Sequence, residues 1–364
     1  MRKKIIFIIL GVIALFFLSQ GMREISKFAP VLWQLFFSRD ISLKKEDNNI
    51  NILALGIGGG THEGPRLTDT IIFSSINLKD NKITLISVPR DLWVPDLNAK
   101  INDAYNQGEV KRKGGGLILS KAVVASVLNQ QIDYAIRVDF DGFVKAVDLI
   151  GGLEIAVDNT FDDYEYPIEG KENDICGHSE EEVQLLATAS SQLEAFPCRY
   201  TNIHFDKGVM LMNGNTALQY VRSRHAKGIE GSDFARSKRQ EKVIKAFKDK
   251  LFSTQTILNP FKIISLYNIL KSHIDTDIKQ EEYDDFTRLF SKVKNANIKS
   301  TVIDYGDSAN NRPGLLVNPL TTSDFKYQWV LIPRIGNGNF SEIKKFVECE
   351  IKTGNCPVSV NPSP

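Results

Sequence analysis

Apolar runs of strand length alternate with amphipathic helical segments along this 364-residue chain, and this alternation restricts the fold more than any other feature. Strands that alternate with helices favour an α/β fold built on one layered sheet. The predicted strands are Asn51–Gly56, Asp69–Asn77, Lys82–Val88, Tyr134–Val138, Leu153–Val157, Lys299–Tyr305 and Gln328–Pro333. The predicted helices are Leu117–Asn129, Phe143–Leu149, Pro260–Ser272, Glu281–Val293 and Ser341–Glu350, and a shorter one lies within Gly208–Gln219.

The chain has no clear linker between residues 50 and 350, so we expect one large domain there. Within it, residues 159–205 are acidic and irregular, and we interpret them as a surface insert. Residues 351–364 are rich in Pro, Asn and Ser and are expected to form a flexible tail.

The N-terminus predicts a membrane anchor. Three basic residues follow Met1, and residues 5–22 carry no charge. No small-residue cleavage pattern follows the apolar core, so we interpret residues 1–22 as an uncleaved signal anchor that forms one transmembrane helix, with a cleaved signal peptide as the alternative. The basic residues would keep the N-terminus in the cytoplasm. The chain is therefore expected in the cell membrane as a single-pass protein, with residues 23–49 as a juxtamembrane linker and the large domain outside the cell.

The cysteines fit an external location. Cys176 and Cys198 flank part of the insert, and Cys349 and Cys356 lie close together near the end of the chain. Two local disulfides are the simplest pairing. A zinc site is an alternative, although neither pair has the short spacing of a zinc knuckle, and free thiols are another.

The charges are balanced in number, and their distribution carries the signal. The 45 Lys and Arg residues match 44 Asp and Glu residues, so no overall field favours nucleic acid as a partner. The basic residues of interest lie in Gln219–Lys245. If Tyr220–Arg224 is extended, Arg222 and Arg224 project from the same face of a strand.

The helix predicted after this strand carries a second part of the same pattern. One stripe along it changes from polar to apolar and consists of Arg236, Gln240, Val243, Phe247 and Leu251. The apolar half must face a core, which directs the polar half inward as well. Guanidinium groups near a helix N-terminus suit a phosphate-bearing ligand, whereas for any single arginine a solvated or locally paired side chain is the simpler interpretation.

Other charged residues stand at predicted strand ends, where open α/β sheets bind ligands. They are Arg66 and Asp69 at the second strand, and Arg90 and Asp91 after the third. Asp69 is a candidate Mg²⁺ ligand beside a phosphate, with an Asp–Arg ion pair as the alternative. The five histidines show no zinc-hydrolase motif and no nucleophile triad, so acyl transfer and zinc hydrolysis are poorly supported.

Several motifs occur in a fixed order between about Asn51 and Phe247. They read RLTDTIIF from Arg66, ISVPRDLWV from Ile86, KINDAY from Lys100, VDFDGF from Val138, NGNTALQYVRSRH from Asn213 and DFARSKRQ from Asp233. Together these blocks resemble the LytR–CpsA–Psr family, as do the membrane anchor and the external domain. The resemblance implies a three-layer α/β/α sandwich with a central mixed sheet and a long apolar pocket for a prenyl chain.

The resemblance also implies an activity. Members of this family take a glycopolymer linked through pyrophosphate to a polyprenyl lipid and move it, with its phosphate, onto a peptidoglycan sugar hydroxyl. The expected partners are therefore a polyprenyl-pyrophosphate-linked glycopolymer, peptidoglycan and the membrane. A non-catalytic or regulatory envelope protein that binds lipid-linked polymer is one alternative, and a polyprenyl-pyrophosphate hydrolase is another.

The motif match assigns roles to particular residues. Those that fall where the family binds pyrophosphate are Arg90, Arg222, Arg224, Arg236 and Gln240. Asp69 falls where the family holds Mg²⁺, and Arg66 and Asp91 lie in matching blocks. We expect Arg90, Asp91, Arg222 and Arg224 to act in catalysis, with Asp91 as a candidate general base and a salt bridge within the arginine cluster as its alternative.

One departure from the family affects the metal. Gly58 stands about where the family has a second metal-binding aspartate. The resemblance then implies a Mg²⁺ site that is weakened, completed by Glu63 or Asp91, or lost.

Overall fold

A computed structural model describes residues 41–45, 48–60, 64–186, 191–251, 253–257, 259–293, 295–307 and 312–360. The predicted anchor over residues 1–22 and most of the predicted linker lie outside these residues. Among the helices that are described, none combines the length and apolar character needed to cross a bilayer. The chain divides into two compact units, residues 45–277 with 296–364, and residues 1–44 with 278–295. The second unit contains α11, Tyr283–Lys292.

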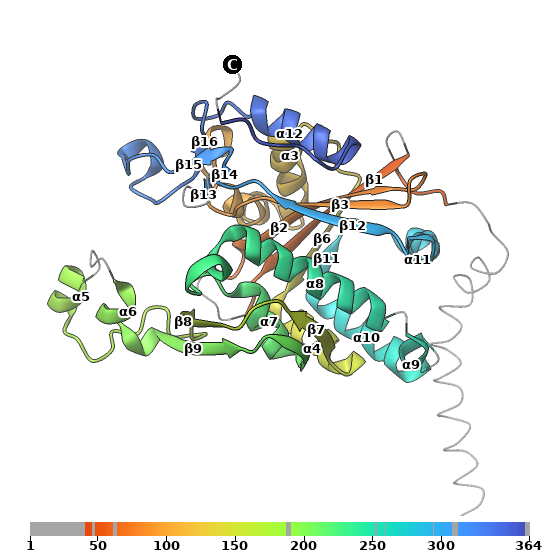
Figure 1. Cartoon of the computed structure of the whole chain (residues 1–364), viewed down its shortest axis with the longest axis horizontal. Coiled ribbons are helices and arrows are strands. Elements are labelled where there is room, and N and C mark those ends of the chain that lie inside the picture. Colours follow the sequence, from red (N-terminus) through yellow and green to blue (C-terminus); the bar gives the residue numbers. More distant parts are fainter. Residues whose placement is uncertain are drawn as a thin grey trace, which may run out of the picture. The chain divides into compact units, whose positions relative to one another are not determined.

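The larger unit is organised around a six-stranded sheet of mixed direction, as predicted (Figure 1). Its order is β11-β6-β1-β2-β3-β12. β1 pairs with β2 in antiparallel and with β6 in parallel orientation, and β3 pairs in parallel with β12. The strands are β1 (Asn49–Ile57), β2 (Thr68–Asn77), β3 (Lys82–Ser87), β6 (Tyr134–Asp139), β11 (Ile274–Thr276) and β12 (Asn297–Val302).

Helices pack on both faces of this sheet. On one face, Leu53, Phe73 and Ile86 share an apolar core with residues of α3 (Gly116–Leu128) and α12 (Ser341–Lys352). On the other face, the Ser87 hydroxyl lies 3.1 Å from that of Ser237 in α8 (Asp233–Leu251). Alternate residues of a strand point to opposite faces, so the near-continuous apolar runs of β1 to β3 reflect burial on both sides.

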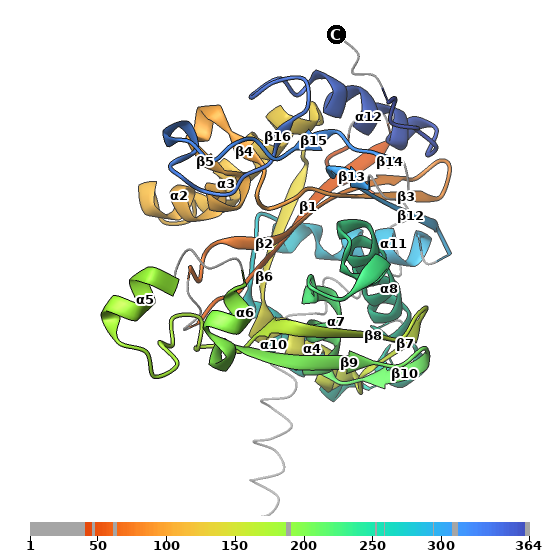
Figure 2. The same cartoon turned by 60° about the vertical axis from the view of Figure 1, so that its left-hand side comes forward.

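A second apolar core lies below α8 and contains two small antiparallel sheets. It joins α4 (Phe140–Ile150) and α7 (Gly214–Arg222) to the pairs β7 (Leu153–Val157) with β10 (Gly208–Met212) and β8 (Phe161–Pro167) with β9 (Tyr200–Phe205). Figure 2 shows the β8–β9 hairpin extending from the β7–β10 pair, with α5 and α6 at its far end. This second core supports the polar residues described below.

The predicted strand over Tyr220–Arg224 is wrong. The Asn213 side chain accepts a hydrogen bond from the Thr216 backbone N–H and starts α7, which ends at Arg222. Ala217 and Tyr220 are buried on one side of this helix, and this spacing of three fits a helix better than a strand. Arg222 therefore ends a helix, and Arg224 lies in the turn after it.

The insert is also more regular than predicted, because residues 161–167 and 200–205 form the β8–β9 hairpin. The β7 strand was correctly located, but it pairs with β10 and does not join the central sheet. The other elements are α2 (Ala104–Lys111), β4 (Trp93–Val94), β5 (Ala99–Lys100), α5 (Glu180–Leu186), α6 (Gln192–Ala195), α9 (Thr254–Ile257), α10 (Pro260–His273), β13 (Gly306–Asp307), β14 (Arg312–Pro313), β15 (Leu316–Val317) and β16 (Ile332–Pro333).

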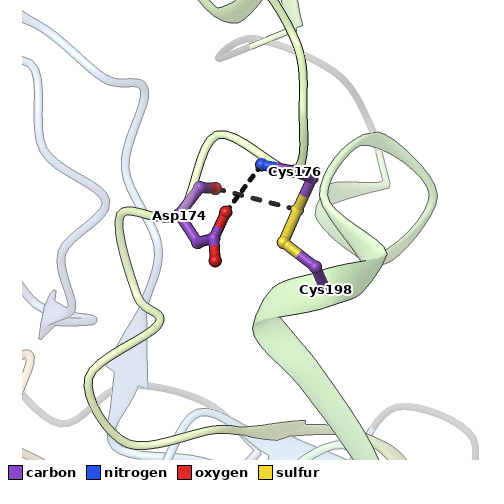
Figure 3. Close-up of side chains that lie close together, drawn as sticks. All are labelled: Asp174, Cys176 and Cys198. Atoms are coloured by element: carbon purple, nitrogen blue, oxygen red, sulfur yellow. Dashed lines mark hydrogen bonds between the residues drawn. A yellow bond between two sulfur atoms is a disulfide. The ribbon is translucent and has the colours of Figure 1, made fainter.

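Both predicted disulfides are present. Cys176 and Cys198 are bonded, with their Cα atoms 5.6 Å apart, and the Cys176 backbone N–H donates to the Asp174 carboxylate (Figure 3). Cys349 of α12 is bonded to Cys356. The three potential metal ligands Asp174, Cys176 and Cys198 lie together, but a disulfide removes the thiolates that zinc needs.

Candidate functional site

Residues from five separate segments meet in one pocket. The start of β2, the turn after β3, the strand β8, the end of α7 and the first half of α8 all contribute to it. The pocket contains six of the seven predicted phosphate- or metal-binding residues, namely Asp69, Arg90, Arg222, Arg224, Arg236 and Gln240. Four guanidinium groups on one concave surface form an arrangement that suits a multiply charged phosphate.

Arg90 connects the pocket to two carboxylates. Its Nη1 donates to Asp69, and its Nε lies 3.4 Å from Asp91 Oδ2. Burial lowers the pKa of Arg90, but Asp69 and Asp91 outweigh that effect and raise it above the usual value. Arg90 is therefore charged at every physiological pH.

Asp91 is buried next to the pocket residue Arg90 and contacts three cationic side chains. Its side chain contacts Arg90, Lys100 Nζ at 2.9 Å and Arg224 Nη2 at 3.6 Å. Burial raises the pKa of Asp91, but Arg90 and the other two cations outweigh it and hold the pKa below its usual value. A carboxylate in this state is a weak base, so the arrangement favours the salt-bridge alternative over general-base catalysis.

Arg222 extends from the end of α7 between two aromatic rings. Its guanidinium lies 4.4 Å from the centre of the Phe140 ring and 5.7 Å from that of Tyr166. Its Nη1 also lies 3.5 Å from the Tyr166 hydroxyl. Burial raises the pKa of Tyr166 although Arg222 lowers it, so this hydroxyl keeps its proton. The rings fix the direction of Arg222 without neutralising its charge.

The turn that follows Arg222 is held by Asp163, a residue that the sequence analysis did not identify. Asp163 is 1% exposed. Its Oδ2 accepts hydrogen bonds from Ser223 Oγ at 2.7 Å, from the Arg224 N–H at 3.0 Å and from the His225 N–H at 3.2 Å. One carboxylate thus sets the backbone from which Arg224 projects.

Arg239 holds the same turn from the other side. It is 2% exposed and donates to the carbonyl oxygens of Tyr220, Ser223 and Glu230, and to the Glu230 carboxylate. Burial lowers its pKa below the usual value, although Glu230 opposes the change. Arg239 therefore acts as a structural cation and differs in role from Arg236, one turn earlier on α8, which lines the pocket.

Arg66 does not join the pocket. It is exposed and precedes β2, whereas Asp69 within β2 lies at the pocket wall. Arg66 comes two residues before β2 begins at Thr68, and it is absent from the pocket lining. Its phosphate-binding role stays a prediction.

The residues around Asp69 bear on the predicted Mg²⁺ site. Gly58 lines a different pocket, with Asp139 and His273, and Glu63 lies outside the described residues. Within the described part of the chain, no group of three metal-ligating side chains surrounds Asp69. A single carboxylate still fits Mg²⁺, because this ion is commonly bound through one or two carboxylates together with substrate phosphates.

The fold and the pocket define a class of α/β proteins with an arginine-lined pocket, whose charge suits an anionic ligand. Residues 26–326 match the LytR_cpsA_psr family, and the chain belongs to that family.

Several curated relatives share one name. A polyisoprenyl-teichoic acid–peptidoglycan teichoic acid transferase TagU of Oceanobacillus iheyensis is 27% identical over 271 residues, which cover 74% of this chain and 71% of the relative. The protein of the same name from Enterococcus faecalis is 26% identical over 321 residues, with 82% and 88% covered.

Solved structures confirm the fold. Bacillus subtilis TagV superposes with a TM-score of 0.52 at 22% identity, over 84% of this chain and 98% of TagV. Bacillus subtilis TagU gives a TM-score of 0.51 at 19% identity, over 85% of this chain and 100% of TagU.

Proposed function

We propose that this protein is a membrane-anchored phosphotransferase that acts outside the cytoplasm. It moves a glycopolymer from a polyprenyl-pyrophosphate carrier onto a hydroxyl of peptidoglycan. The observation that carries the proposal is the convergence of Arg90, Arg222, Arg224, Arg236 and Gln240 on one pocket. Membership of the family and the transferase names of the curated relatives support it.

The residues suggest how the reaction is promoted. The acceptor oxygen attacks the phosphorus that carries the glycan, and the bond from that phosphorus to the bridging oxygen breaks. The electron pair leaves with the polyprenyl phosphate. Arg222 at the end of α7 and Arg224 in the following turn flank Ser223, where Asp163 and Arg239 fix the backbone, so both arginines stabilise the developing charge without rearrangement.

Asp69 is the residue that would hold Mg²⁺, together with oxygens of the pyrophosphate. The ion, when bound, would neutralise phosphate charge. Arg90 already binds Asp69, so it keeps this carboxylate at the pocket wall before any ion arrives. Asp69→Asn should therefore raise the Mg²⁺ concentration that transfer requires, and a binding titration with Mn²⁺ as a paramagnetic probe would measure the loss of ion affinity directly.

The membrane anchor and the external location belong to the same proposal. Their support is the uncharged run of residues 5–22 behind a basic N-terminus, and the two disulfides, which persist in oxidising compartments. Protease added to intact cells should degrade the large domain and spare the N-terminal tail.

The transfer reaction can be tested with the full-length protein in detergent. The substrates are a labelled polyprenyl-pyrophosphate glycan, peptidoglycan fragments and Mg²⁺. Label on peptidoglycan supports the proposal, whereas lipid phosphate released without transfer indicates a hydrolase, and binding without either product indicates a non-catalytic protein.

Two variants address the pocket. Arg222→Ala and Arg90→Ala should each lower transfer by a factor of about 100 or more, since each removes a donor to the reacting phosphates. Arg112→Ala is the control, because Arg112 is exposed at the end of α2. Full activity in both pocket variants would overturn the assignment of the site.

A further inference from the structure

The proposed transfer needs a group that accepts the proton of the attacking hydroxyl, and the pocket offers few. Its described acid–base side chains are Asp69, Asp163, Glu165, Tyr166 and His225. Asp69 is engaged by Arg90, and Tyr166 keeps its proton because burial raises its pKa. Asp163 is buried and accepts four hydrogen bonds, from Ser223 and from the backbone of residues 165, 224 and 225. Elimination leaves His225 and Glu165.

These two side chains form an ion-pair contact at the solvent side of the pocket. His225 Nδ1 lies 3.7 Å from Glu165 Oε2, and the side chains are 56% and 42% exposed. The contact comes from distant parts of the chain, since Glu165 lies in β8 and His225 follows the arginine-bearing turn. An exposed pair of this kind contributes little to stability, so a structural need does not explain it.

The backbones of both residues are fixed by one buried group. Asp163 Oδ1 accepts the Glu165 N–H at 3.0 Å, while Oδ2 accepts the His225 N–H at 3.2 Å. The same Oδ2 accepts the Arg224 N–H. Asp163 therefore sets the position of the histidine, its carboxylate neighbour and a phosphate-binding arginine together.

We propose that His225 is the general base of the transfer reaction and that Glu165 orients its ring. This inference rests on the proposed function. With Nδ1 directed at Glu165, Nε2 is left to accept the proton, and no described residue donates a hydrogen bond to it. As the acceptor oxygen forms its bond to phosphorus, its proton passes to Nε2 and later to water, while polyprenyl phosphate leaves with the electron pair of the broken bond.

The charges around the pair suit this role. Asp163 and Glu165 face His225 from β8, Arg222 and Arg224 precede it on its own segment, and Arg236 lines the pocket from α8. The arginines bind phosphate, and Glu165 lies beside ring nitrogen Nδ1 of His225. Imidazoles titrate near neutral pH, which is the range in which a general base works best.

The test compares two histidines of the same region in full-length protein. His225→Gln should lower kcat for transfer about 100- to 10,000-fold near neutral pH. The native protein should show a fall of kcat/KM at low pH, and this fall should disappear in His225→Gln because the base is lost. The KM for the lipid-linked donor should stay nearly unchanged, since the arginines that bind it are intact.

His204→Gln is the matched control. His204 is similarly exposed, lies in β9 and contacts Asp162 at 2.8 Å, but it does not line the pocket. This variant should keep both the rate and the pH profile. Glu165→Gln should lower kcat about tenfold and retain the acid limb, because the base is still present.

The outcomes separate the two proposals. If the native protein transfers glycan and His225→Gln does so at a similar rate with an unchanged acid limb, the inference is wrong and the proposed function stands. If the native protein transfers nothing under any of these conditions, the proposed function fails and the inference fails with it.

Discussion

Replacement of Asp163 by Asn tests whether one buried carboxylate organises the pocket. The substitution keeps the shape of the side chain but removes its charge and one of its acceptor oxygens. The Asp163 carboxylate accepts four hydrogen bonds. The donors are Ser223 Oγ and the backbone N–H groups of Glu165, Arg224 and His225. An amide cannot accept on both sides, so at least one N–H group must face the NH₂ of the asparagine.

The magnitude follows from the number of bonds. Hydrogen bonds to a charged group contribute about 1 kcal/mol more than neutral ones, so four bonds give a loss of about 4 kcal/mol in the free energy that holds this turn. Asp163 and Ser223 are 1% and 0% exposed, so water cannot readily replace the lost partners. A loss of about 4 kcal/mol corresponds to a roughly thousandfold larger equilibrium constant for opening of the turn.

Hydrogen exchange followed by mass spectrometry measures this opening directly. In Asp163→Asn, amide exchange at Ser223–His225 should accelerate strongly, and transfer activity should fall because Arg224 and His225 lose their fixed backbone. Asp162→Asn is the control. Asp162 precedes Asp163 on β8, and its described ion pair is with the exposed His204. Unchanged exchange at Ser223–His225 in Asp163→Asn would refute the reasoning.

Two further substitutions probe the buried charged residues Asp91 and Arg239. The pKa of Asp91 is held below its usual value of 3.8, so the ionised side chain stabilises the fold above about pH 4, and this contribution is lost as the pH falls through the folded-state pKa. Asp91→Asn should lower the free energy of unfolding, measured in urea at pH 7, by about 3–5 kcal/mol. This difference from the native protein should shrink below about pH 4. Asp96→Asn is the control and should cost almost nothing, because Asp96 is exposed. Arg239→Lys should lower the free energy of unfolding by about 2–4 kcal/mol, because an ammonium group cannot donate to three carbonyl oxygens in the planar geometry of a guanidinium, and a midpoint equal to that of the native protein would contradict this role.

Much of the central sheet could be predicted from sequence because its signal is local. The strands β1, β2 and β3 are continuous apolar runs, and α3 and α12 show a helical spacing of buried residues. The end of α7 could not be predicted in this way. Tyr220, Arg222 and Arg224 alternate with smaller residues, which is a pattern typical of a strand. The helix is indicated by its N-cap residue Asn213, which lies seven residues before Tyr220.

The pocket was predicted in part for a related reason. The sequence indicates Arg90, Arg222 and Arg236 because each is a charged residue next to an apolar stretch of the chain. Asp163 gives no such signal, since it is one acidic residue in a polar hairpin and its burial arises only when β8 packs against the turn after α7. The contact between Glu165 and His225 likewise depends on the pairing of distant segments, which periodicity does not report.

The β8–β9 hairpin is already in register at Pro167 and Tyr200, before the disulfide-bonded segment of residues 168–199 begins. The segment beyond that closing pair can change in length or composition while Asp163 keeps its place. The segment between Pro167 and Tyr200 can therefore be replaced without disturbing the pocket residues at the base of the hairpin. A variant with a short turn between Pro167 and Tyr200 should fold with the same pocket.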